Sequence, residues 1–132
     1  MSLPHQRTHK YHLGTTEKAE IPFDFIVRGK TLPAGTYVLR RINDTTETLE
    51  IENFMNHEHV MFQTEALQSR NAPRRDALLF HRYGDTYFLR QIRVAGEADR
   101  LELAKPREER RLQNEAAENN VAGPDTVAVL LH

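Results

Sequence analysis

The chain of 132 residues contains no cysteine, which excludes disulfide bonds, thiolate metal sites and thiol nucleophiles. No apolar run approaches the ~18 residues that a membrane-spanning helix needs. Net charge is also small, because 18 basic and 19 acidic residues leave −1 at pH 7. A general polyanion binder normally carries a basic field, so we expect no nucleic-acid partner. Serine occurs only as Ser2 and Ser69, both without a paired base, and we expect no catalytic serine.

Residues 1–18 are expected to form a polar N-terminal arm. A secretory signal peptide needs an apolar stretch of ~7–15 residues, and this segment has none. As written the chain is therefore expected to be cytoplasmic, or exported if it is a processed or trimmed form. His5 and His9 would share one face of a helix and could hold a metal there. Pro4 and Gly14 bracket too little apolar sequence for that helix, which favours the arm.

Residues 19–104 are predicted to be an antiparallel β domain. Ile21, Phe23, Phe25 and Val27 alternate along the chain with the period of two that is typical of a half-buried strand. Further runs of strand length follow, separated by short turns. The predicted strands are residues 21–27, 36–42, 47–52, 60–66, 76–83 and 86–94, with a late run at 126–131. Such a series indicates an antiparallel β-sandwich or small β-barrel of six to seven strands.

The strongest local signal is a hairpin around Gly84-Asp85. Two strand-like runs joined by a two-residue Gly-X turn favour a type I′ or II′ turn. The resulting register places Phe80 opposite Leu89 as a core pair, and His81 opposite Phe88.

Residues 105–132 are predicted to contain one helix and a tail strand. Pro106 suits a helix start, and residues 107–118 are rich in good helix formers with little apolar surface. Thr126–Leu131 carries no charge and no proline, so it must dock on its own sheet or pair with another chain. We expect a homodimer through Thr126 to Leu131.

Three stretches together resemble a family of small uncharacterised soil-bacterial β-proteins. They are IPFDFIVRGKTLPAGTY (21–37), LLFHRYGDTYFL (78–89) and ELAKPREERR (102–111). They match a Phe-x-Phe strand, a Leu-Pro-Ala-Gly-x-Tyr turn, a Phe-x-Arg-Tyr-Gly hairpin and an Arg/Glu-rich tail. The resemblance implies a small β fold and no known activity. Its members usually begin with a signal peptide, whose place the polar residues 1–18 take here.

The residue types that carry chemistry give only weak metal candidates. His57 and His59 are spaced so that both point to one face of a strand, as in the HxH pair of cupin barrels, with His81 as a guessed third ligand. The flanking glycines and later ligands of that pattern are missing, which favours two exposed histidines beside a turn. The glycines stand alone, so no phosphate-binding loop is expected.

The arginine pairs at 40–41, 74–75 and 110–111 have acidic neighbours and are interpreted as solvated surface. We therefore expect a non-catalytic small binding or structural module with no cofactor and an unknown ligand or protein partner. The alternative is a metal-dependent, cupin-like small-barrel enzyme or metal-binding protein that uses His57 and His59.

Overall fold

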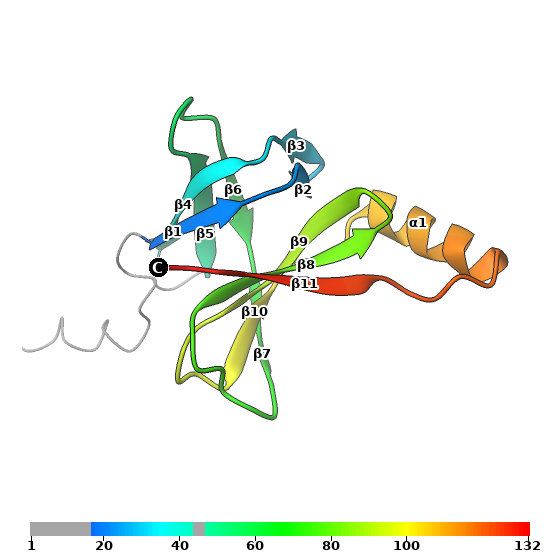
Figure 1. The fold of residues 1–132 in the computed structure, drawn as a ribbon. Coiled ribbons are helices and arrows are strands. Elements are labelled where there is room, and N and C mark those ends of the chain that lie inside the picture. Colours follow the sequence, from blue (N-terminus) through cyan, green and yellow to red (C-terminus); the bar gives the residue numbers. More distant parts are fainter. Residues whose placement is uncertain (1–16, 44–46) are drawn as a thin grey trace, which may run out of the picture.

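The computed structural model describes residues 17–43 and 47–132, which form two β-sheets and one helix (Figure 1). The first sheet has the strand order β1-β4-β5-β6 and is antiparallel throughout. Its strands are β1 (Glu17–Ile21), β4 (Gly35–Asn43), β5 (Thr48–Asn53) and β6 (His59–Gln63). Leu49 and Ile51 of β5 are fully buried, whereas Glu50 and Glu52 point to the other face and bond Arg40. The alternation that the sequence predicts for β5 is confirmed.

The second sheet has the order β11-β8-β9-β10-β7. Its strands are β7 (Glu65–Gln68), β8 (Ala77–Tyr83), β9 (Thr86–Arg93), β10 (Asp99–Glu102) and β11 (Asp125–Leu130). A small hairpin of β2 (Phe25–Val27) and β3 (Lys30–Leu32) joins this sheet through one parallel bridge between Ile26 and Phe88. The fold is therefore mainly β, with the two sheets packed together but not closed into a barrel.

The predicted strand 21–27 is two strands in different sheets. The chain leaves β1 at Pro22, which has no N–H to continue a ladder, and enters β2 three residues later. Asp24, in this crossing, accepts a hydrogen bond from the backbone N–H of Ala34 at 2.9 Å. That bond fixes the crossing against the turn that precedes β4.

The predicted strand 60–66 is divided in the same way. Thr64 stands at the corner between β6 and β7, where its backbone N–H and its hydroxyl both donate to the carbonyl of Glu47. The short strands β3 and β10 were not expected. Together these features give eleven strands in the described part of the chain where six to seven are predicted, within the predicted mainly β architecture.

The β8–β9 hairpin has the predicted register. Phe80 lies opposite Leu89 and His81 opposite Phe88, and both members of the Phe80–Leu89 pair are buried. Gly84 has φ +62° and is the one residue of this turn with a positive φ, which identifies the turn as type II′.

The core lies between the two sheets and joins the β2–β3 hairpin to both. Phe25 packs edge to face on Tyr37 of the first sheet and on Phe80 of the second, with ring centroids 5.0 and 5.5 Å apart. The Tyr37 hydroxyl donates to the carbonyl of Pro33 at 2.6 Å. This bond satisfies the hydroxyl and closes the Leu-Pro-Ala-Gly-x-Tyr turn on itself, so that the ring enters the core.

The C-terminal part forms the predicted helix α1 (Arg107–Glu118) and the predicted tail strand. β11 docks antiparallel on β8 of its own chain, and an isolated bridge between Leu131 and Ala19 ties its end to β1 (Figure 1). Helix α1 projects beyond the second sheet. No helix in the described ranges is long and apolar enough to cross a membrane.

β1 begins at Glu17, so two residues of the predicted arm are strand. Residues 1–16, with His5 and His9, lie outside the described residues.

Candidate functional site: the trough beside strand β6

Helix α1 is fastened to the second sheet through one buried carboxylate, that of Glu109. Its Oε2 lies 2.6 Å from Nδ1 of His81 and accepts a hydrogen bond from the Tyr83 hydroxyl at 2.8 Å. Its Oε1 accepts a hydrogen bond from Nη1 of Arg90 at 3.0 Å. Arg90 also donates from Nη2 to the carbonyl of Leu103 at 3.1 Å. The cluster thus holds both the helix and the segment before it against β8 and β9.

Arg90 reaches this position because β9 has a β-bulge. Leu79 pairs with Gln91 and Phe80 pairs with Leu89, which leaves Arg90 as the extra residue on β9. A bulge turns one side chain away from its regular direction. Here the bulge lets the Arg90 side chain lie under the first turn of α1, where it is only 5% exposed.

The charge states of the cluster are set by its surroundings. Burial raises the pKa of Glu109, but hydrogen bonds from His81 and Tyr83 and the charge of Arg90 outweigh it and lower the pKa below its usual range. Burial, followed by the hydrogen bond to Glu109, raises the pKa of Tyr83. The carboxylate therefore stays ionised and the phenol protonated near neutral pH. Because the buried Glu109 carboxylate has a hydrogen-bond partner on each oxygen, its role is to hold α1 against the second sheet.

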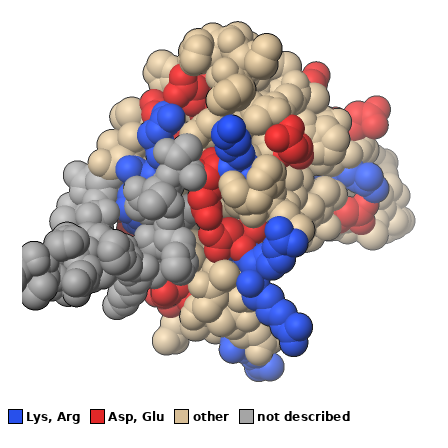
Figure 2. Space-filling model, turned by 60° about the vertical axis from the view of Figure 1, so that its left-hand side comes forward, with Lys and Arg blue, Asp and Glu red and all other residues tan. Residues whose placement is uncertain are grey.

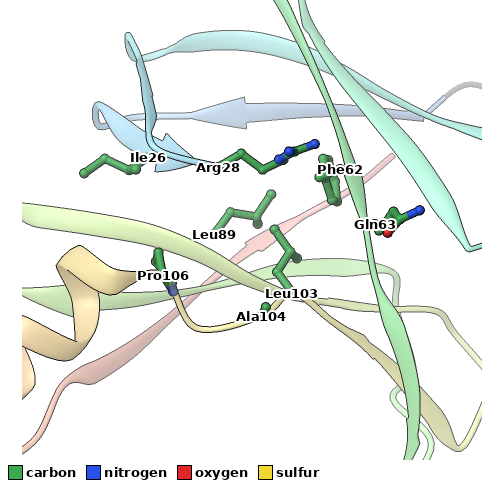
Figure 3. Close-up of a pocket in the computed structure, with 8 residues that line it drawn as sticks. All are labelled: Ile26, Arg28, Phe62, Gln63, Leu89, Leu103, Ala104 and Pro106. Carbon is green, nitrogen blue, oxygen red and sulfur yellow. The ribbon is translucent and has the colours of Figure 1, made fainter.

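The segment that the cluster positions forms one wall of a trough between the two sheets (Figure 3). The first hollow has a volume of about 270 Å³. It is lined by Ile26, Arg28, Phe62, Gln63, Leu89, Leu103, Ala104 and Pro106. A second hollow of about 320 Å³ shares Gln63, Leu103 and Ala104 with it and continues toward Lys105. We call the two together the trough.

Arg28 crosses the trough at one end. Figure 3 shows its side chain directed toward β6. Its Nη1 donates to the backbone carbonyl of Met61 at 3.3 Å, and the residue is exposed. The walls of the first hollow are otherwise mainly apolar, with Phe62, Leu89 and Leu103 from three different strands or connections. The second hollow is lined mainly by polar and charged residues, namely Gln63, Thr64, Glu65, Arg90, Glu102 and Lys105. The first hollow thus combines apolar walls with the cation of Arg28 at its rim, and the second hollow adds charged groups of both signs.

The three predicted metal candidates are not brought together. His57 and His59 are exposed and lie beside carboxylates of β5: His57 Nδ1 is 2.9 Å from Glu52, and His59 Nε2 is 4.0 Å from Glu50. His81 belongs instead to the Glu109 cluster on the second sheet. In residues 17–43 and 47–132, no group of three or more metal-ligating side chains converges.

The arginine pairs have mixed surroundings. Arg111 bonds Glu115, one of its predicted acidic neighbours, and Arg40 bonds Glu50 and Glu52 across the sheet. The prediction of solvated surface is wrong for Arg41, whose side chain is only 3% exposed and lies 3.2 Å from Glu47. Arg74 and Arg75 are exposed and form no ion pair with a described residue. In the face that Figure 2 shows, blue and red side chains are scattered among uncharged ones, and several basic side chains gather at its lower end.

Arg90 and Glu109 of the cluster, and Arg28 at the trough, were missed from the sequence. Glu109 sits in a helix of mostly charged residues, a pattern that predicts a solvated side chain. Arg90 lies in a strand whose alternating sequence gives no sign of a bulge. The only available signal was the pattern of α1, since Leu112 and Ala116 lie at i+3 and i+7 from Glu109 and share its face. That face is the one turned to the sheet.

Comparison of the chain with protein-family models, with curated proteins and with solved structures gives no match.

Proposed function

We propose that the protein is a non-catalytic binding module and that the trough is its ligand site. The observation that carries this proposal is the open seam between β6 and the second sheet, where a hollow lined mainly by apolar side chains and the exposed cation of Arg28 continues into a more polar one. Clefts of this composition are typical of ligand sites, although one of about 270 Å³ is small for a cofactor. The Glu109 cluster supports the proposal because it holds one wall of the trough rigid.

We also propose that the chain belongs to the family of small soil-bacterial β-proteins that its motifs resemble. The three stretches that carry the resemblance meet in space. Residues 21–37 supply Ile26 and Arg28 to the trough, and residues 78–89 supply Leu89. Residues 102–111 supply Leu103, Ala104 and Pro106, together with the buried Glu109. A shared binding surface would account for why these stretches form one set.

The binding function is tested by screening small organic fragments against isotope-labelled protein and following its backbone amide signals. Ala104 is exposed and lines both hollows, so Ala104→Trp fills the trough without entering the core. Ala122→Trp is the matched control, because Ala122 is exposed and lies in the linker before β11. We expect ligands that shift trough residues and that bind the control but not Ala104→Trp. The proposal would be contradicted if no fragment binds, or if the fragments bind the wild type, Ala104→Trp and Ala122→Trp equally well.

A second copy of the chain is the other partner that we propose, through the free edge of β11. Leu131 N–H bonds the carbonyl of Asp76, whereas His132 and Lys18 exchange bonds on the opposite side. By the alternation of an antiparallel ladder, Thr126, Ala128 and Leu130 direct their backbone groups away from β8. An edge strand of this kind, without charge or proline in its centre, is a template for pairing.

Antiparallel pairing of two copies would be centred on Ala128. The variant Ala128→Lys places two like charges side by side at that centre, and Ala122→Lys is the control in the linker. Sedimentation over a range of concentrations should show dimers for the wild type and the control and monomers for Ala128→Lys. An unchanged oligomeric state in Ala128→Lys would reject this interface.

A further inference from the structure

The outer edge of β6 is an unpaired strand edge that faces the trough. Toward β5, the carbonyl of Glu58 accepts from Asn53 and the N–H of Thr64 donates to Glu47. Residues of the opposite parity, His59, Met61 and Gln63, therefore direct their N–H and C=O groups away from β5. The bond from Arg28 to the Met61 carbonyl agrees with this assignment. Among the described strands, none pairs with β6 on that side.

Arg28 is held in place at a conformational cost. It forms a two-residue turn with Gly29 between β2 and β3, and both residues have positive φ, +52° and +78°. This is a type I′ turn, in which asparagine, aspartate and glycine are the favoured residues. A left-handed backbone is unfavourable for arginine, and residues held in that way cluster at ligand sites. The position thus carries a side chain that its backbone does not favour.

Within residues 17–43 and 47–132, the guanidinium of Arg28 also lacks an anionic partner. Its hydrogen bond goes to a neutral carbonyl, and it forms no ion pair with a residue in the described ranges. Lys30, at the other end of the same turn, is paired with Glu58 at 3.4 Å. The cation at the rim of the trough is therefore available to an anionic group of a ligand.

From these observations we infer that the trough takes an extended acidic peptide segment, which adds as a strand to the outer edge of β6. This inference rests on the proposed binding function and names its ligand class. The peptide backbone bonds His59, Met61 and Gln63, and its N–H replaces Arg28 on the Met61 carbonyl. The released guanidinium binds an aspartate or glutamate of the peptide in a charge-assisted hydrogen bond.

The geometry also predicts the peptide pattern. Alternate residues of a strand point to one side, so a side chain two positions from the acidic residue points the same way. We therefore expect a large apolar residue at that spacing, seated between Phe62 and Leu103. Main-chain bonds supply affinity in this mode, and the acidic and apolar residues supply selectivity.

The test is selection from a phage-displayed library of random 12-residue peptides on the full-length protein. Enriched peptides should carry Asp or Glu two positions from a large apolar residue. Synthetic copies should bind about tenfold more weakly to Met61→Pro, which lacks the outward N–H, than to Met61→Ala, which retains it. They should also bind about tenfold more weakly to Arg28→Gln than to Lys30→Gln. N-methylation of alternate peptide residues should weaken binding to the unaltered protein, which keeps the test valid if Met61→Pro fails to fold.

The outcomes separate this inference from the proposed function. If no peptide is enriched, or if binding is indifferent to Met61→Pro and to N-methylation, strand addition is wrong, even where fragments sensitive to Ala104→Trp are found. If the enriched peptides carry no acidic residue, Arg28 does not bind an acidic side chain of the ligand. If neither fragments nor peptides are sensitive to Ala104→Trp, the trough is not a binding site and both proposals fail.

Discussion

The guanidinium of Arg90 lies 3.0 Å from the carboxylate of Glu109, although one belongs to a bulge of β9 and the other to the first turn of α1. Both side chains are buried, and neither has another buried group of opposite charge among its hydrogen-bond partners. The bulge and the helix therefore depend on each other. Because Arg90 also bonds the carbonyl of Leu103, the same pair holds a wall of the trough.

Removal of the Glu109 carboxylate should be strongly destabilising. Glu109→Ala leaves Arg90 as an unpaired buried cation, and breaking a buried pair in this way costs about 3–5 kcal/mol. Urea unfolding followed by circular dichroism measures the loss. Glu108→Ala is the control, since Glu108 precedes it in the same turn but is exposed. Equal unfolding free energies for the two variants would show that the buried Arg90–Glu109 pair contributes no more to stability than an exposed glutamate does.

The parts of the fold that depend on local patterns were predictable from the sequence. The type of turn at Gly84 fixes the β8–β9 register, so the pairing of Phe80 with Leu89 follows from a two-residue spacing. The extent of α1 likewise follows from Pro106 and a run of good helix formers. These features require no knowledge of what lies across the core.

The candidate site was not predictable in the same way, because it depends on where strands change sheets. The alternation of residues 21–27 continues without interruption through Pro22 to Asp24, yet the chain passes there from one sheet to the other. The bulge at Arg90 and the burial of Glu109 arise from packing between distant segments. The trough exists because β6 and the second sheet do not pair, which no local pattern encodes.

The hairpin turn should be sensitive to a side chain at Gly84. Its φ of +62° is left-handed, and a Cβ there would meet no neighbouring atom, so Gly84→Ala tests the backbone alone. The expected loss is about 1–2 kcal/mol in the free energy of unfolding. Gly123→Ala, at a position without positive φ or close neighbours, should be neutral or stabilising by up to about 1 kcal/mol. Chemical denaturation of both variants checks this, and similar losses would refute the assigned turn.

Folding stability should fall as the pH rises from about 4.5 to about 8, through Glu17 on β1. Burial and a hydrogen bond with the neighbouring Asp76 raise the pKa of Glu17 from 4.5 to about 8. The folded chain therefore holds this proton where the unfolded chain has lost it, which makes unfolding easier as pH increases through that window. The lowered pKa of Glu109 acts below about 4.5, where acid removes its contribution.

The variant Glu17→Gln isolates this effect. It should flatten the decline in unfolding free energy between pH 4.5 and 8, and it should be more stable than the wild type at pH 8. Glu118→Gln, at an exposed helix position, should leave the decline unchanged. Thermal unfolding across the pH range provides the measurement, and a wild-type decline that survives in Glu17→Gln would assign the effect to another group.

Arg28 should show opposite effects on stability and binding. Asparagine is favoured at the first position of a type I′ turn, so Arg28→Asn relieves the left-handed strain at φ +52°. The change removes only one long hydrogen bond, at 3.3 Å to Met61, from an exposed side chain. We expect the free energy of unfolding to be unchanged or higher by about 0.5–1 kcal/mol, with acidic peptides from the selection bound about tenfold more weakly. Denaturation and calorimetric titration of the same samples measure both quantities. A destabilised variant that binds normally would contradict the assignment, because it would make Arg28 a structural clip between β2 and β6 instead of a ligand-binding residue.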